Sequence, residues 1–86
     1  MFINKTKNGR NNLCGEQIAQ LRVKLGVSQR KLAGMLQLKG LDIDKNAIQR
    51  IEAGKRFVTD IELVYFSELF RVPLEDLLSN DRLTDE

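Results

Sequence analysis

The sequence predicts an all-α domain built from five short helices. Apolar residues recur three and four positions apart along five successive segments, which is the periodicity of amphipathic helices. No segment shows a sustained two-residue alternation, and the single proline, Pro73, lies between two of the predicted helices. At 86 residues the chain has room for one domain with a modest apolar core.

The first helix is predicted to run from Cys14 to Leu25. Ile18, Leu21 and Leu25 recur at helical spacing, and Gly26 follows at the position where glycine commonly ends a helix. Cys14 is the one cysteine of the chain and cannot form an intrachain disulfide, which fits a reducing cytoplasm. We interpret it as a partly buried small side chain without catalytic use.

The second helix is predicted to begin after Ser28. Serine is a preferred N-cap because its hydroxyl accepts a hydrogen bond from a free N–H group in the first helical turn. The apolar stripe of this helix consists of Leu32, Ala33 and Leu36. The segment 37–39 either extends the helix to Gly40 or belongs to the loop that follows.

The last three helices are marked by capping residues. Asp44 is a suitable N-cap for the third helix, and Gly54 is placed to end it. Thr59 and Glu62 match the capping box at the start of the fourth helix. The expected buried residues are Ala47, Ile48 and Ile51 in the third helix and Leu63, Phe66, Ser67 and Phe70 in the fourth, and Leu74, Leu77 and Leu78 are expected to form the short fifth helix.

Charge is unevenly distributed along the chain. Residues 1–58 contain twelve Lys/Arg and four Asp/Glu, a net charge of +8, whereas residues 59–86 contain two Lys/Arg and eight Asp/Glu, a net charge of −6. This division favours one face that binds a polyanion and a second face kept away from it. The sequence has no histidine and no apolar run long enough to span a bilayer. We therefore expect no enzyme, no metal or cofactor site, no membrane contact and a cytoplasmic location.

The outward face of the third helix is polar and lacks acidic residues. At 100° per residue, Ile48 and Ile51 point inward, which leaves Asn46, Gln49 and Arg50 outside. Asn and Gln can pair twice with adenine, and Arg and Lys can pair with guanine in the major groove. Lys45 lies at the flank of this face, Gln29 at the start of the second helix, and Lys55 and Arg56 after the third helix. A solvated helix surface would also be polar, so this face alone does not decide between the two interpretations.

The ordered set of motifs from Ile18 to Leu78 resembles the Cro/repressor-type helix-turn-helix family, also called the XRE family. The matching motifs are Ile18-x-x-Leu21-Arg22, Gly26-Val27-Ser28-Gln29-x-x-Leu32-Ala33, Ile48-x-x-Ile51-Glu52-x-Gly54-Lys55-Arg56, and Val72-x-Leu74-x-x-Leu77-Leu78. They cover about sixty of the eighty-six residues. The resemblance implies a lambda-repressor-like domain of five helices whose third helix enters the major groove.

The resemblance also implies roles for individual residues. It implies base reading by Lys45, Asn46, Gln49 and Arg50. It implies contacts to the DNA backbone by Ser28, Gln29, Lys55 and Arg56. It further implies a structural ion pair between Arg22 on the first helix and Glu52 near the end of the third, which would hold the recognition helix in place.

The connection between the second and third helices departs from the family pattern. Counted from Leu36 to Ile48, the chain has five residues more than the usual member. The additional residues fall within 37–43 and form either another helical turn or a longer loop. We expect Leu38, Leu41 and Ile43 to pack this segment against the domain.

Three regions follow from these patterns. They are a flexible basic N-terminal arm at 1–13, a helix-turn-helix DNA-binding domain at 14–79 and an acidic C-terminal tail at 80–86. The expected function is sequence-specific binding of double-stranded DNA by a repressor-like transcriptional regulator, as a homodimer on DNA. The alternative is a protein-interaction module, such as an antitoxin or adaptor, whose acidic part binds an unknown protein partner.

Overall fold

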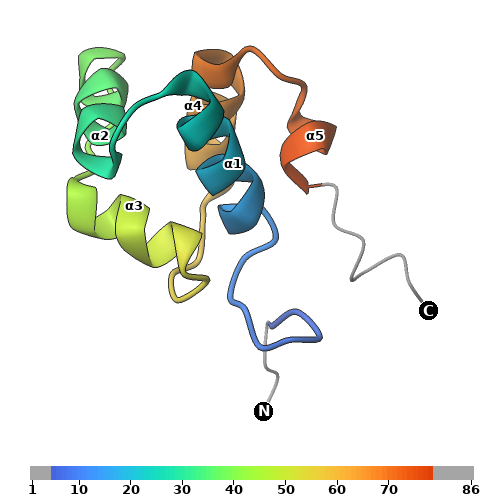
Figure 1. Cartoon of the computed structure of the whole chain (residues 1–86). Helices are drawn as coiled ribbons and strands as arrows, with labels where there is room; N and C mark the ends of the chain where they lie inside the picture. The colour runs from blue at the N-terminus through green and yellow to red at the C-terminus, as the bar shows by residue number, and fades with distance from the viewer. Residues whose placement is uncertain (1–4, 79–86) are drawn as a thin grey trace.

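A computed structural model describes residues 5–78 as five helices joined by loops (Figure 1). The helices are α1 (Gly15–Leu25), α2 (Gln29–Leu38), α3 (Lys45–Glu52), α4 (Asp60–Phe70) and α5 (Leu74–Leu78). The predicted all-α, five-helix fold is confirmed. None of these helices is long and apolar enough to cross a membrane within the described part of the chain. The predicted acidic tail at 80–86 lies outside the described residues.

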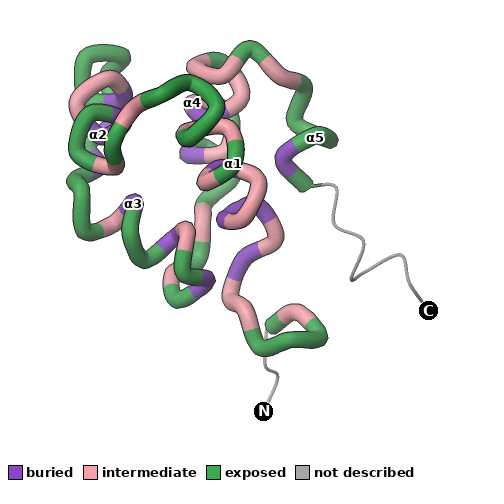
Figure 2. Tube along the Cα trace, in the orientation of Figure 1, coloured by how far each residue is buried: buried purple, intermediate pink, exposed green. Residues whose placement is uncertain are grey.

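The core receives buried residues from every helix (Figure 2). The fully buried side chains include Ile18, Leu32, Leu36, Ile48, Ile51, Phe66 and Leu77. Three leucines of α1 and α5 remain exposed: Leu25 at 49%, and Leu74 and Leu78 at 41% each. Leu25 is the last residue of α1, and α5 has only five residues, so Leu77 alone of its leucines reaches the core.

Local capping fixes where three helices begin. The Ser28 hydroxyl accepts a hydrogen bond from the Lys31 N–H at 3.0 Å, and the Asp44 carboxylate accepts one from the Ala47 N–H at 2.8 Å. At the start of α4, Thr59 forms the complete capping box with Glu62. The predicted N-caps are therefore confirmed. These local hydrogen bonds fix the first turns of α2, α3 and α4.

The lengthened α2–α3 connection combines both expected forms. α2 continues to Leu38, and a loop then returns the chain to α3. Leu41 and Ile43 are buried in this loop, and the Gln37 amide donates to the Ile43 carbonyl at 2.7 Å. Leu38 is 91% exposed, so the expectation that it would pack the segment down is wrong. It is the last residue of α2, and its side chain lies beyond the reach of the core.

Residues 5–13 are folded against the end of α3, whereas we expected a flexible arm over residues 1–13, of which residues 1–4 lie outside the described part of the chain. Asn12 is buried, and its side-chain amide donates to the carbonyls of Ile51 and Arg56. Residues 6–10 form a tight turn in which the Thr6 N–H donates to the Arg10 carbonyl at 2.8 Å. Composition predicts a coil here because asparagine and glycine favour turns, but Asn11 and Asn12 find partners about forty residues further along the chain.

Candidate nucleic-acid interface

The polar face of α3 is exposed, whereas its apolar face is fully buried. Ile48 and Ile51 are completely inaccessible to solvent, which fixes the rotation of α3 about its axis. The residues that this rotation leaves exposed are Lys45, Asn46, Gln49, Arg50 and Ala53. Figure 1 shows α3 at the edge of the bundle, below α2, so its outer face is not covered by another helix.

Three of the four predicted base readers meet around one surface hollow. Asn46, Gln49 and Arg50 line a shallow concavity of about 330 Å³ together with Ala53 and Lys55. No acidic side chain lines this hollow. Its donors and acceptors are of the kind that pairs with base edges, and its two cations suit phosphate oxygens. Lys45, the fourth predicted reader, is exposed in the first turn of α3 but does not line the hollow.

An ion pair ties α1 to the end of α3. The Arg22 Nε lies 2.7 Å from Glu52 Oε2, and a second guanidinium nitrogen donates to Oε1 at 3.1 Å. The third nitrogen donates to the Val27 carbonyl at 2.9 Å. The hydrogen bond to Glu52 raises the pKa of the Arg22 guanidinium, and burial opposes this increase. The expected pair of Arg22 and Glu52 is thus present as a bidentate ion pair. The remaining Arg22 nitrogen holds the turn between α1 and α2.

The start of α2 is joined to the same carboxylate. The Gln29 amide nitrogen donates to Glu52 Oε1 at 2.9 Å, so its side chain is turned toward α3. Ser28 remains exposed at the N-terminus of α2, where its hydroxyl caps the helix. A helix N-terminus presents free N–H groups to a phosphate oxygen. The Gln29 side-chain amide is thus engaged with Glu52, and Ser28 is the exposed residue at the N-terminus of α2.

Lys55 and Arg56 are adjacent in sequence but differ in their surroundings. Lys55 is exposed and lines the hollow beside α3. The Arg56 guanidinium donates to both carboxylate oxygens of Glu62 at 2.9 Å and to the Phe57 carbonyl at 3.0 Å. This pairing lowers the pKa of the Glu62 carboxyl, an effect that burial opposes and hydrogen bonds from Thr59 reinforce. Arg56 therefore anchors the loop to α4, a role that its position in a basic loop did not reveal.

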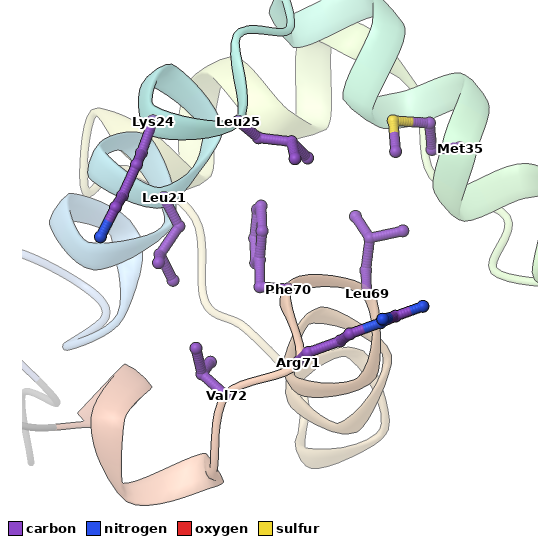
Figure 3. Close-up of a pocket in the computed structure, with 8 residues that line it drawn as sticks. All are labelled: Leu21, Lys24, Leu25, Met35, Leu69, Phe70, Arg71 and Val72. Atoms are coloured by element: carbon purple, nitrogen blue, oxygen red, sulfur yellow. The ribbon is translucent and has the colours of Figure 1, made fainter.

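A second concavity lies away from the α3 face. Figure 3 shows an apolar groove of about 530 Å³ between α1, α2 and the end of α4. Its lining residues are Leu21, Lys24, Leu25, Met35, Leu69, Phe70, Arg71 and Val72. No residue of α3 lines it, and its surface is mostly hydrocarbon. Within residues 5–78, no group of three or more His, Cys, Asp or Glu side chains is arranged to hold a metal ion.

These features define a helix-turn-helix DNA-binding domain, in which α2 and α3 pack together and α3 exposes a polar face. The chain belongs to the helix-turn-helix family, whose sequence model matches residues 18–77. The fold is similar to the crystal structure of the restriction-modification controller protein C.AhdI from Aeromonas hydrophila, with a TM-score of 0.63 and 22% sequence identity. The alignment covers 73% of this chain and 84% of that chain. A comparison of the sequence with curated proteins found no match.

Proposed function

We propose that this protein is a repressor-like transcriptional regulator that binds specific sequences of double-stranded DNA with α3 in the major groove. The observation that carries the proposal is the hollow lined by Asn46, Gln49, Arg50 and Lys55, which faces outward and contains no carboxylate. Family membership supports DNA binding in general. The composition of the hollow supports the further step, which is recognition of base edges.

The proposed contacts divide into base reading and backbone binding. Asn46, Gln49 and Arg50 are the proposed base readers within the hollow, with Lys45 at its flank. Lys55 and the N-terminus of α2 at Ser28 and Gln29 are the proposed backbone contacts. For Arg56, the pair with Glu62 supports an indirect role in holding the loop that carries Lys55.

A homodimer bound to two half-sites is the proposed active form. One domain of this size contacts DNA over about 600–1,000 Å², which limits the affinity of a single copy. Two-fold symmetric regulators overcome this limit by binding two half-sites about one helical turn apart. We further propose that the protein binds without catalysing a reaction and acts in the cytoplasm or nucleoid.

A protein-interaction module such as an antitoxin or adaptor is the competing function. Its structural basis would be the apolar groove of Figure 3, whose rim carries Lys24 and Arg71. That groove provides contact area but does not identify what would occupy it. The side chains on the exposed polar face of α3 match the hydrogen-bonding groups of base edges and phosphates. DNA binding is therefore the function that we propose.

Selection of binders from random duplex DNA tests the proposal, with the affinity of the selected site measured at several salt concentrations. We expect a palindromic consensus and a steep linear fall of log affinity with log salt concentration. Arg50→Ala should relax the preference at one base pair at a cost of about 1–3 kcal/mol, and Lys55→Ala should reduce the salt slope by about one unit for every sequence.

Lys24→Ala is the matched control for these variants, because Lys24 is an exposed cation that lies at the apolar groove. It should leave affinity and consensus close to those of the wild type. Weak binding that ignores sequence would contradict the proposal and favour the protein-interaction module. An unchanged consensus for Arg50→Ala would remove Arg50 from the base readers.

A further inference from the structure

We infer that Arg10–Asn12 forms a clamp that positions the DNA-contacting end of α3, and that Asn11 influences DNA affinity through Lys55. The inference rests on the proposed function and adds positioning residues from a region that the helix-turn-helix motif does not include. The clamp is defined as Arg10, Asn11 and Asn12 with the carbonyls to which they donate.

The end of α3 closes with a Schellman motif. Gly54 adopts a left-handed conformation with φ of 78°, and its N–H donates to the Ile51 carbonyl at 3.0 Å. The Lys55 N–H donates to the Arg50 carbonyl at 2.9 Å. Lys55 is therefore held to the helix through its own backbone. This closure leaves the carbonyls of Glu52, Gly54, Lys55 and Arg56 in need of donors from elsewhere.

The clamp supplies those donors. An Arg10 guanidinium nitrogen donates to the Glu52 carbonyl at 2.7 Å. The Asn11 backbone N–H donates to the Gly54 carbonyl at 2.8 Å, and its side-chain amide donates to the Lys55 carbonyl at 3.1 Å. The Asn12 amide donates to the carbonyls of Ile51 at 3.0 Å and Arg56 at 2.8 Å. Three consecutive residues thus bind nearly every carbonyl from the last turn of α3 to the start of the next loop.

Arg10 is placed for structural support and not for direct contact with DNA. Its side chain is only 14% exposed and forms an ion pair with Glu16 at 3.6 Å. A methyl group added to Gly54 would lie 2.7 Å from the Arg10 Cζ, so the guanidinium packs directly on the glycine backbone. A cation at this position also complements the partial negative charge at the C-terminus of α3.

The turn before the clamp fixes the direction in which the clamp residues approach the end of α3. The Gly9 N–H donates to the Thr6 carbonyl at 2.9 Å, and the Arg10 N–H donates to the Thr6 hydroxyl at 3.0 Å. Gly9 has a φ of 84°, which glycine adopts without strain. Lys5 then donates to the Asn11 side-chain oxygen at 2.9 Å, which orients the Asn11 amide nitrogen toward Lys55. The segment 5–11 is thereby folded onto the edge of the candidate interface.

Asn11→Ala is the most informative variant, because it removes the bond to the Lys55 carbonyl and leaves Arg10 and Asn12 in place. In the protein without DNA, hydrogen exchange of the Lys55 amide should become about fivefold faster, while exchange of the Ile48 and Ile51 amides stays unchanged. Asn8→Ala is the matched control, since Asn8 accepts a bond from Thr6 within the same segment and does not reach Lys55. Unchanged exchange at Lys55 would overturn the clamp, whether or not the protein binds DNA.

A double-mutant cycle on the selected DNA site then tests the role in binding. We expect Asn11→Ala to weaken binding about fivefold and to flatten the salt slope, as Lys55→Ala does. In the Lys55→Ala background, Asn11→Ala should change affinity less than twofold, because the Lys55 side chain that Asn11 positions against DNA is already absent. Equal losses in both backgrounds would overturn the inference. Absence of any selected site for the wild-type protein would instead contradict the proposed function, and the exchange measurement would still decide whether the clamp exists.

Discussion

Gly15, the first residue of α1, lies against the Ile51 carbonyl oxygen of α3 with no room for a side chain between them. A methyl group built on Gly15 would overlap that oxygen and would also come within 2.6 Å of an Arg10 guanidinium nitrogen and 2.7 Å of Asn12 Oδ1. The Gly15 N–H in turn donates to Asn12 Oδ1 at 2.8 Å. This glycine therefore allows α1, α3 and the clamp to meet at one point.

Gly15→Ala should lower the free energy of unfolding by about 2–3 kcal/mol, because the carbonyl that it would meet is backbone and cannot rotate away. Gly34→Ala is the matched control within α2, where an added methyl group meets no atom within 4 Å. It should raise the free energy of unfolding by about 0.5–1 kcal/mol, since alanine is the better helix former. Chemical denaturation of both variants checks the pair, and equal effects of the two substitutions would contradict the close approach.

Glu62 should make the stability of the domain depend on pH in the acidic range. The hydrogen bond from Arg56 lowers the pKa of the Glu62 carboxyl in the folded protein. The stabilisation is therefore complete above the pKa of the unfolded chain, about 4.3, and is lost as the pH falls through the lower folded value. Glu62→Gln should cost about 1–2 kcal/mol at pH 7 and much less near pH 3. Parallel curves of unfolding free energy against pH for the two proteins would show that the pair does not act in this way.

Cys14 should be unreactive in the folded protein. Burial raises the pKa of the Cys14 thiol to about 11, although it lies at the start of α1, where a lowered value could have been expected. Because the thiolate is the reactive form, labelling by a thiol reagent at pH 8 should be at least about a hundredfold slower in native protein than in denatured protein. Comparable labelling rates in the two states would show that Cys14 is exposed.

Arg71→Gly should stabilise the protein by about 0.5–1 kcal/mol. Arg71 ends α4 in a left-handed conformation with φ of 57°, which glycine adopts without the steric cost of a side chain. Arg71→Ala keeps that cost while removing the charge, so it serves as the control and should not stabilise. Thermal unfolding of both variants separates the backbone effect from the charge, and equal melting temperatures would exclude backbone strain as the cause.

Helix starts were predictable because their determinants are local. Ser28, Asp44 and Thr59 each bind an N–H group three residues further along, a distance over which sequence order fixes geometry. The rotation of α3 was predictable for the same reason, since the spacing of Ile48 and Ile51 defines one helix face.

The contacts that could not be predicted join distant parts of the chain. Nothing in an asparagine-rich segment indicates that Asn12 binds carbonyls 39 and 44 residues away. The pairing of Arg56 with Glu62 crosses from a loop into α4, where helical periodicity does not apply. Composition therefore suggested a flexible arm where the structure uses Asn12 to bind the end of α3, and nothing local indicated that Arg56 also binds α4.

α3 has only eight residues, and its shortness has a consequence for regulation. Isolated helices below about 12–15 residues are marginal in water, so α3 exists as a helix only when Asp44, the core and the clamp hold it. The concentration of DNA-competent molecules is then set by the folded fraction of the whole domain. In a marginally stable protein, a substitution far from the interface can lower operator occupancy simply by depleting that fraction.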